Sequence, residues 1–252
     1  MAKVKVISHR GSNKVAPQNT LPAFRQSILY GADGFETDVH LCADGTPVIC
    51  HNYEVDKTSD GKGLISSMTL EQLKALDFGI KFHHSYKGTK LPTLEEFLTL
   101  SEKANLSVLN IEIKPPKDHN YDVVTKVVEA VKAHNLYDIL LISSFDTDAL
   151  VAAKDVDETC KTGILYSPDK IESTKYLRHA VDVAKSIGAD ALHPHKSYIN
   201  ESYVEKAHEA GLIVNPWTVN SEKDIRHAIE CGCDGVITDV PNIAKKIVES
   251  YE

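Results

Sequence analysis

Eight short runs of β-branched and other apolar residues, each followed by a segment that can be helical, are the feature that most limits how this chain can fold. The runs span residues 4–8, 34–39, 107–113, 139–143, 163–166, 189–193, 212–218 and 235–238. Between them, apolar residues recur at helical spacing, as the valines of residues 121–134 do. Strands that alternate with helices in this way predict a sheet of parallel strands.

Residues that favour helix ends mark where several of these helices begin. Thr93 and Glu96 form a capping box before an apolar helix, Ser221 begins another, and Pro241 suits the first turn of the last one. Eight βα units in 252 residues predict a (β/α)₈ TIM barrel, as a single domain over residues 1–252. A doubly wound open sheet has the same alternation, and periodicity alone does not separate the two folds.

One long stretch, residues 42–91, interrupts the alternation after the second predicted strand. It contains turn signals at residues 43–46 and 60–63, a short strand at residues 47–51 and a short helix that begins at Thr69. Connections of this length are usually functional. We therefore predict an insertion subdomain that folds over the mouth of the barrel.

The composition excludes several classes of protein. Lysine and arginine number 28 and aspartate and glutamate 36, so the formal net charge is −8. With 42% hydrophobic and 25% charged residues, the chain is typical of a globular protein and not of a disordered one. An acidic balance without a basic block argues against non-specific binding of nucleic acid. The longest unbroken apolar run, residues 149–153, is too short to span a membrane.

Cysteine usage and the first residues bear on the cellular compartment. The N-terminus has no apolar stretch of the roughly 7–15 residues that a secretory signal needs. The five cysteines are an odd number; Cys231 and Cys233 form a C-x-C pattern and the others are scattered. These features predict a reduced, cytoplasmic protein. The sequence leaves the oligomeric state open between a monomer and a homodimer.

Acidic side chains cluster at the ends of two predicted strands. Glu36 and Asp38 are two residues apart and share one face of their strand, and Glu112 ends the next strand, before Lys114. Three buried carboxylates that converge on one barrel mouth repel one another. A divalent cation removes this repulsion, and carboxylate ligands suit Mg²⁺, Ca²⁺ or Mn²⁺. For Glu36 and Asp38 alone, structural salt bridges are the alternative interpretation.

Basic side chains stand at neighbouring positions of the predicted fold. His9 and Arg10 end the first predicted strand, and His51 closes the short strand of the insertion. The planar guanidinium of arginine matches phosphate oxygens, and histidine is the commonest general acid or base. Together with the carboxylates, these residues indicate metal-assisted phosphoryl chemistry.

Beyond these positions, a series of short motifs resembles one known family, the glycerophosphodiester phosphodiesterases. The matching motifs cover residues 9–11 (His-Arg-Gly), 17–20, 31–39, 44–51, 112–114, 144–145, 217–220 and 235–239. They keep the order of the family's motifs over nearly the whole chain. No single triplet is specific, but the combination is.

The resemblance implies a TIM barrel with a small insertion after the second strand. It also implies metal-dependent hydrolysis of small-molecule glycerophosphodiesters, such as glycerophosphocholine and glycerophosphoethanolamine, to sn-glycerol 3-phosphate and an alcohol. The implied roles are Glu36, Asp38 and Glu112 as ligands of one divalent cation, His9 and His51 as the acid–base pair, Arg10 and Lys114 near the phosphate, and Trp217 in the substrate pocket.

Two residues depart from the family pattern. Gln18 stands where the family usually has glutamate, and Asn52, after His51, stands where it usually has aspartate. Neither is an implied metal ligand, so we expect activity. Two alternatives stay open: a barrel phosphodiesterase of the lysophospholipase D or phosphoinositide type, and a barrel that binds glycerophosphodiesters with weakened catalysis.

Overall fold

The computed structural model of the chain describes residues 3–114, 120–168 and 179–251. The strands are β1 (Lys5–His9), β2 (Gly34–Leu41), β3 (Pro47–Ile49), β4 (Val108–Ile113), β5 (Leu140–Ser144), β6 (Thr162–Tyr166), β7 (Ala191–Pro194), β8 (Ile213–Val214) and β9 (Gly235–Thr238). The helices are α1 (Leu21–Leu29), α2 (Leu70–Ala75), α3 (Leu94–Ser101), α4 (Asp122–Ala133), α5 (Thr147–Val156), α6 (Ala180–Ser186), α7 (Glu201–Glu209), α8 (Glu222–Glu230) and α9 (Pro241–Glu249).

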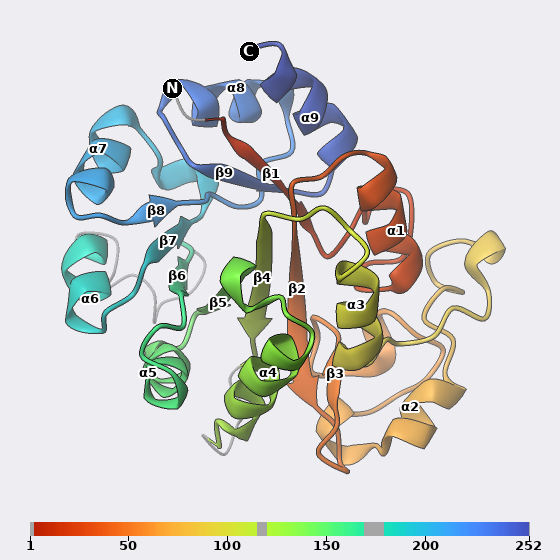
Figure 1. Cartoon of the computed structure of the whole chain (residues 1–252). Coiled ribbons are helices and arrows are strands. Elements are labelled where there is room, and N and C mark those ends of the chain that lie inside the picture. The colour runs from red at the N-terminus through yellow and green to blue at the C-terminus, as the bar shows by residue number, and fades with distance from the viewer. Residues whose placement is uncertain (1–2, 115–119, 169–178, 252) are drawn as a thin grey trace.

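Eight of these strands form one parallel sheet that curls into a barrel, with helices around its outside (Figure 1). The strand order is β8-β7-β6-β5-β4-β2-β1-β9. At the two ends of this order, the Asp234 backbone N–H donates to the Val214 carbonyl at 3.0 Å and that of Ile237 to Pro216 at 3.0 Å. These bonds bring the edges together, so the predicted (β/α)₈ TIM barrel is confirmed, and the doubly wound open sheet is not the fold.

The outer helices bury the faces that the sequence pattern indicates. In α4, the five valines at helical spacing are buried: Val123, Val124, Val127, Val128 and Val131. The capping box at the start of α3 forms as predicted, since the Thr93 hydroxyl accepts the Glu96 N–H and the Glu96 side chain accepts the Thr93 N–H. Burial on both faces explains why β2 and β4 are almost continuously buried.

The predicted strand at residues 212–218 is much shorter in the structure, where β8 comprises only Ile213–Val214. Pro216 has no N–H group and cannot continue the ladder of hydrogen bonds. The chain nevertheless stays against β7, because the backbone N–H of Trp217 donates to the Pro194 carbonyl at 3.0 Å. This contact holds Trp217 at the carboxyl end of the barrel.

Residues 42–91 contain β3, which pairs antiparallel with β2, and the short helix α2. Their buried side chains form an apolar cluster separate from the main core, made of Cys42, Val48, Cys50, Val55, Ile65, Leu73, Phe78 and Leu91. The assignment of this stretch as an insertion subdomain over the mouth stays a prediction. Among the described helices, none has both the length and the apolar character to cross a membrane.

Candidate active site

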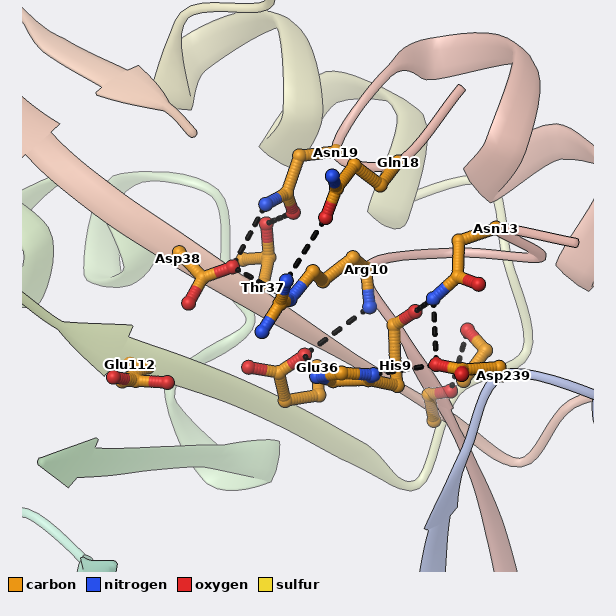
Figure 2. Close-up of polar contacts among 12 residues, drawn as sticks. His9, Arg10, Asn13, Gln18, Asn19, Glu36, Thr37, Asp38, Glu112 and Asp239 are labelled. Atoms are coloured by element: carbon orange, nitrogen blue, oxygen red, sulfur yellow. Dashed lines mark hydrogen bonds and ion pairs between the residues drawn. The ribbon is translucent and has the colours of Figure 1, made fainter. Parts of the chain in front are cut away.

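Three carboxylates meet at the carboxyl ends of two adjacent strands. Glu36 and Asp38 lie on β2, Glu112 lies on β4, and Asp38 and Glu112 are directly opposite in the register of the two strands. All three residues are buried, and each offers an oxygen that lies within 4.8 Å of the others' (Figure 2). Such a cluster of oxygens has the chemistry of a divalent cation site.

Two cationic side chains contact this cluster. Lys114 Nζ lies 2.7 Å from Asp38 Oδ1 and 2.5 Å from Glu112 Oε1. Arg10 Nε lies 3.3 Å from Asp38 Oδ2. Three carboxylates therefore face two cations, and with all of them ionised one negative charge is left. A bound divalent cation would turn this into one positive charge, which suits an anionic phosphodiester.

The surroundings affect the three acids differently. Burial raises the pKa of Glu36 well above its usual range, and the charge of Asp38 raises it further. Burial also raises the pKa of Glu112, although Lys114 opposes it. For Asp38, burial alone would raise the pKa, but Lys114 and Arg10 hold it well below its usual range. The cost of burying a negative charge is thus not fully offset at Glu36 and Glu112, and the site fits a divalent cation.

A tight turn directs Arg10 at the carboxylates. Arg10 and Gly11 both have left-handed backbone conformations, with φ of 56° and 78°. A Cβ atom at Gly11 would lie only 2.7 Å from backbone and side-chain carbons of Ala23, so the close packing on α1 requires glycine. The turn aims the Arg10 N–H at Glu36 Oε2, 3.1 Å away, and Arg10 Nη1 donates to Gln18 Oε1 at 2.9 Å. Gln18 therefore contacts Arg10 as a neutral hydrogen-bond acceptor.

His9 is oriented by a carboxylate from the other end of the chain. Its Nδ1 lies 2.6 Å from Asp239 Oδ1, and Figure 2 shows this contact. Burial alone would raise the pKa of Asp239, but the hydrogen bond from His9 holds that pKa below its usual range. The ionised carboxylate can only accept, so Nδ1 carries the proton. His9 Nε2, 3.9 Å from Glu36 Oε2, is left for proton transfer.

Neither candidate acid–base imidazole is charged near neutral pH. Burial lowers the pKa of His9, and the nearby Arg10 lowers it further. Burial likewise lowers the pKa of His51 to about 3. His51 Nδ1 lies 3.3 Å from Asn52 Oδ1, so an amide oxygen orients this ring where the family pattern has a carboxylate.

A cavity of about 430 Å³ brings most of these side chains together. Its described lining is His9, Arg10, Glu36, His51, Glu112, Phe145, Leu165, Ser167, His195, Trp217, Thr218 and Ile237. Phe145 and His195 meet the Trp217 ring edge-to-face, at 5.6 and 5.7 Å between centroids. The two predicted site residues outside this lining, Asp38 and Lys114, are buried beside it in contact with each other. The cavity thus has a charged half and an aromatic half.

A larger cavity, about 820 Å³, opens at the opposite end of the barrel, around the starts of β1, β4 and β5. None of the predicted site residues is among its described lining. In TIM barrels this face contributes stability, while chemistry takes place at the carboxyl ends of the strands. The smaller cavity is therefore the candidate active site.

Sequence reasoning gave no role to several polar residues of the site. Asp239 directly follows β9, and the available signals were its place at a strand end and its position in the motif of residues 235–239. Asn13 and Asn220 each donate to Asp239, at 2.7 and 2.8 Å. Asn19 donates to Asp38 Oδ2 at 2.7 Å. The three asparagines lie in loops. Asn19 and Asn220 fall within the motifs of residues 17–20 and 217–220, but no spacing rule gives any of the three a role.

Comparison with known proteins agrees with this site. A family model described as the glycerophosphoryl diester phosphodiesterase family matches residues 9–243. A protein of Caldanaerobacter subterraneus named glycerophosphodiester phosphodiesterase is 36% identical over 246 residues, covering 98% of each chain. A protein of that name from Bacillus altitudinis is 31% identical over 250 residues, covering 98% of this chain and 99% of its own.

Solved structures show the same architecture. A phosphodiesterase of Oleispira antarctica, solved in complex with the product sn-glycerol-3-phosphate, is 32% identical to this chain and superposes with a TM-score of 0.86. The match covers 97% of this chain and 96% of the Oleispira chain.

Proposed function

The chain belongs to the glycerophosphoryl diester phosphodiesterase family and is therefore a phosphoric diester hydrolase, and we propose that it cleaves glycerophosphodiesters such as glycerophosphocholine and glycerophosphoethanolamine. The products are sn-glycerol 3-phosphate and an alcohol. The observation that carries this proposal is the single cavity in which Glu36 and Glu112 meet His9 and His51. The product bound to the Oleispira enzyme supports a small-molecule substrate.

The proposed cofactor is one divalent cation, Mg²⁺ or Ca²⁺, with Mn²⁺ also suited to an all-oxygen site. Glu36, Asp38 and Glu112 would hold it. When bound, it supplies Lewis acidity toward a phosphoryl oxygen. Arg10 lines the cavity and binds the phosphate oxygens, and Lys114 adds positive charge from beside Asp38 and Glu112.

The two imidazoles transfer the protons. One of His9 and His51 accepts the proton of the nucleophile, and the other donates a proton to the leaving alkoxide. The nucleophile is either water or the glycerol 2-hydroxyl, and the second route passes through a cyclic phosphate. Hydrolysis in ¹⁸O-water, with a search for the cyclic species, separates the two routes.

The aromatic half of the cavity is proposed to bind the carbon skeleton of the substrate. Trp217 is held by its indole N–H, which donates to the His193 carbonyl at 2.8 Å, and by the edge of Phe145. A rigid aromatic wall opposite the charged groups orients the diester, because the anionic phosphate faces the charged half while the glycerol carbons or a cationic alcohol such as choline pack on the ring.

The decisive experiment is an assay of metal-reconstituted protein against a panel of glycerophosphodiesters, reading out sn-glycerol 3-phosphate. We expect turnover of glycerophosphocholine or glycerophosphoethanolamine and much slower turnover of lysophosphatidylcholine. Faster turnover of lysophosphatidylcholine would assign the site to the lysophospholipase D type. Tight binding of the diesters without product release would assign it to a binding barrel.

We also propose a cytoplasmic location, which the state of the cysteines supports. All five are free and buried, as expected for packing residues in a reduced compartment.

Asp239 is proposed to position His9, and its replacement tests this role. We expect Asp239→Ala to lower kcat by about 10–100-fold with a smaller change in KM, because the ring loses the partner that fixes its tautomer. Asp239→Asn should be at least as damaging, since its amide NH₂ can donate to Nδ1 and leave the proton on Nε2. The measurement is steady-state kinetics of both variants.

A matched control for Asp239 is available at the other end of the barrel. Asp234 Oδ2 lies 2.9 Å from His208 Nε2, a similar pair far from the carboxyl ends of the strands. Asp234→Asn should keep wild-type kcat. Unchanged kcat in both Asp239 variants would show that Asp239 does not position His9 for catalysis.

A further inference from the structure

Residues 79–90, a segment within the stretch of residues 42–91, expose apolar and cationic side chains side by side to solvent. Residues 79–90 contain three lysines, two histidines and no acidic residue, in a chain whose net charge is −8. Ile80 and Phe82 in this segment are 38% and 40% exposed. In Figure 1 the segment is the yellow loop that extends beside α1. Exposed apolar groups rimmed by one sign of charge are typical of an interaction surface.

The exposed side chains belong to an ordered backbone. The buried carboxylate of Asp77 accepts the N–H groups of Gly79 and Ile80 on Oδ1 and that of Gly88 on Oδ2, at 2.9, 3.1 and 2.7 Å. The Phe82 ring meets Tyr86 edge-to-face at 5.5 Å. These contacts fix the loop at both ends, so Ile80 and Phe82 are held outward.

The lysines of the segment form no ion pair with a described carboxylate, although the charge of Lys90 acts on the nearby Asp77. Lys81 Nζ donates to the Asp56 carbonyl, and Lys90 Nζ donates to the carbonyls of Ala75 and Leu76 at 3.3 and 3.2 Å. In the described ranges, no ion pair joins Lys81, Lys87 or Lys90 to an acid. Lys81 and Lys87 therefore keep their positive charge available to an anionic partner.

This surface continues onto the loop that supplies the active site. Tyr86 Oη donates to the Val15 carbonyl at 2.7 Å, and Val15 is itself 42% exposed. Val15 lies in the same β1–α1 connection as Arg10 and Asn13, which contact Glu36 and Asp239. A partner bound at the segment would therefore lie close to the mouth of the barrel.

We propose that Val15, Ile80 and Phe82, with Lys81, Lys87 and Lys90, form a surface that docks the enzyme onto an anionic lipid bilayer. Aromatic and aliphatic side chains enter the headgroup region, while lysines keep their ammonium groups among anionic headgroups. The rest of this acidic chain is repelled by such a bilayer, so the contact also orients the molecule. This surface is independent of the hydrolytic reaction.

The test is sedimentation of the full chain with vesicles of phosphatidylcholine alone and with vesicles that contain equal parts of phosphatidylglycerol. We expect binding to the anionic vesicles only, with loss of binding at high salt. Lys81→Gln with Lys87→Gln should weaken binding by about 25-fold, at roughly fivefold for each lysine. Ile80→Ser with Phe82→Ser should weaken it by about tenfold or more.

Matched controls separate this surface from general effects of charge and hydrophobicity. Lys206→Gln with Lys223→Gln removes the same charge from α7 and α8, and Leu29→Ser removes an apolar side chain that is 78% exposed. These controls should bind like wild type, and every variant should hydrolyse a soluble diester at the wild-type rate. Equal binding by wild type and both surface variants would overturn the proposal. So would binding to polyglutamate without binding to anionic vesicles, which would assign the surface to an acidic protein.

Discussion

Alanine at His9 or at His51 is expected to lower kcat by about 10²–10⁴-fold, the usual contribution of a positioned acid or base. Both rings line the cavity beside Glu36, and burial lowers the pKa of each, so both are neutral near pH 7. A neutral imidazole can accept the proton of the nucleophile, and the ring that acts as the acid must bind a proton before it donates one to the leaving alkoxide. Alanine removes that group without changing the acidic cluster.

The two variants differ in what they leave behind. His9→Ala leaves the ionised Asp239 with Lys14 and with the amides of Asn13 and Asn220, and it loses the closest contact, at 2.6 Å. Some loss of stability is expected in that variant, because an ionised carboxylate loses a hydrogen-bond donor. His51→Ala breaks only the 3.3 Å contact with Asn52, so it is the cleaner test.

Steady-state kinetics of both variants check this prediction. A diester with a weakly basic leaving group should restore turnover to the variant that lacks the general acid and not to the variant that lacks the base. His134→Ala is the control and should keep wild-type kcat, because His134 directly follows α4 and pairs with Glu95 outside the cavity. Wild-type turnover in either site variant would exclude that histidine from the mechanism.

The parts of the site that the sequence predicts come from one strand or from strand ends. Glu36 and Asp38 share a face because side chains alternate along a strand, whatever the rest of the molecule does. Their proximity to Glu112 needs only that parallel barrel strands end on the same side. Eight repeated βα units predict parallel strands, but a doubly wound open sheet has the same alternation. The hydrogen bonds that join the two edges of the sheet decide for the barrel, and the comparisons with known proteins agree with it.

The parts that the sequence does not predict depend on register between distant segments. His9 and Asp239 are 230 positions apart, and they meet because β1 pairs with β9, with Ser8 opposite Thr238. The contact between Asn19 and Asp38 depends on the path of an irregular loop. No periodicity encodes either contact, because each depends on a loop or strand end that meets a distant segment of the chain.

Removal of divalent cations is expected to abolish activity, and Mg²⁺, Ca²⁺ or Mn²⁺ should restore it. The physical reason is the imbalance at the acidic cluster, where three buried carboxylates face only Arg10 and Lys114. A cation that binds only the folded protein also stabilises it, by about 2.7 kcal/mol at a hundred times its dissociation constant. Metal-free protein should therefore melt at a lower temperature than metal-loaded protein.

Glu36→Gln is the variant that tests this site without unfolding it. Burial and the charge of Asp38 raise the pKa of Glu36, so a neutral amide of the same shape relieves repulsion in the absence of metal. We expect the metal-free variant to be at least as stable as metal-free wild type, with metal affinity reduced about 100-fold or more. Asp38→Asn, in contrast, should destabilise the protein, because it leaves Lys114 and Arg10 without their shared anion.

Thermal melting during a metal titration measures this affinity separately from catalysis. Wild type and the control Asp234→Asn should gain stability as metal is added, whereas Glu36→Gln should gain none in the same concentration range. If metal raised the melting temperature of Glu36→Gln as much as that of wild type, the metal would bind somewhere other than the acidic cluster. Full activity of exhaustively chelated wild type would show that Arg10 and Lys114 alone compensate the charge of the phosphodiester, and the carboxylates would then serve only to hold those two cations.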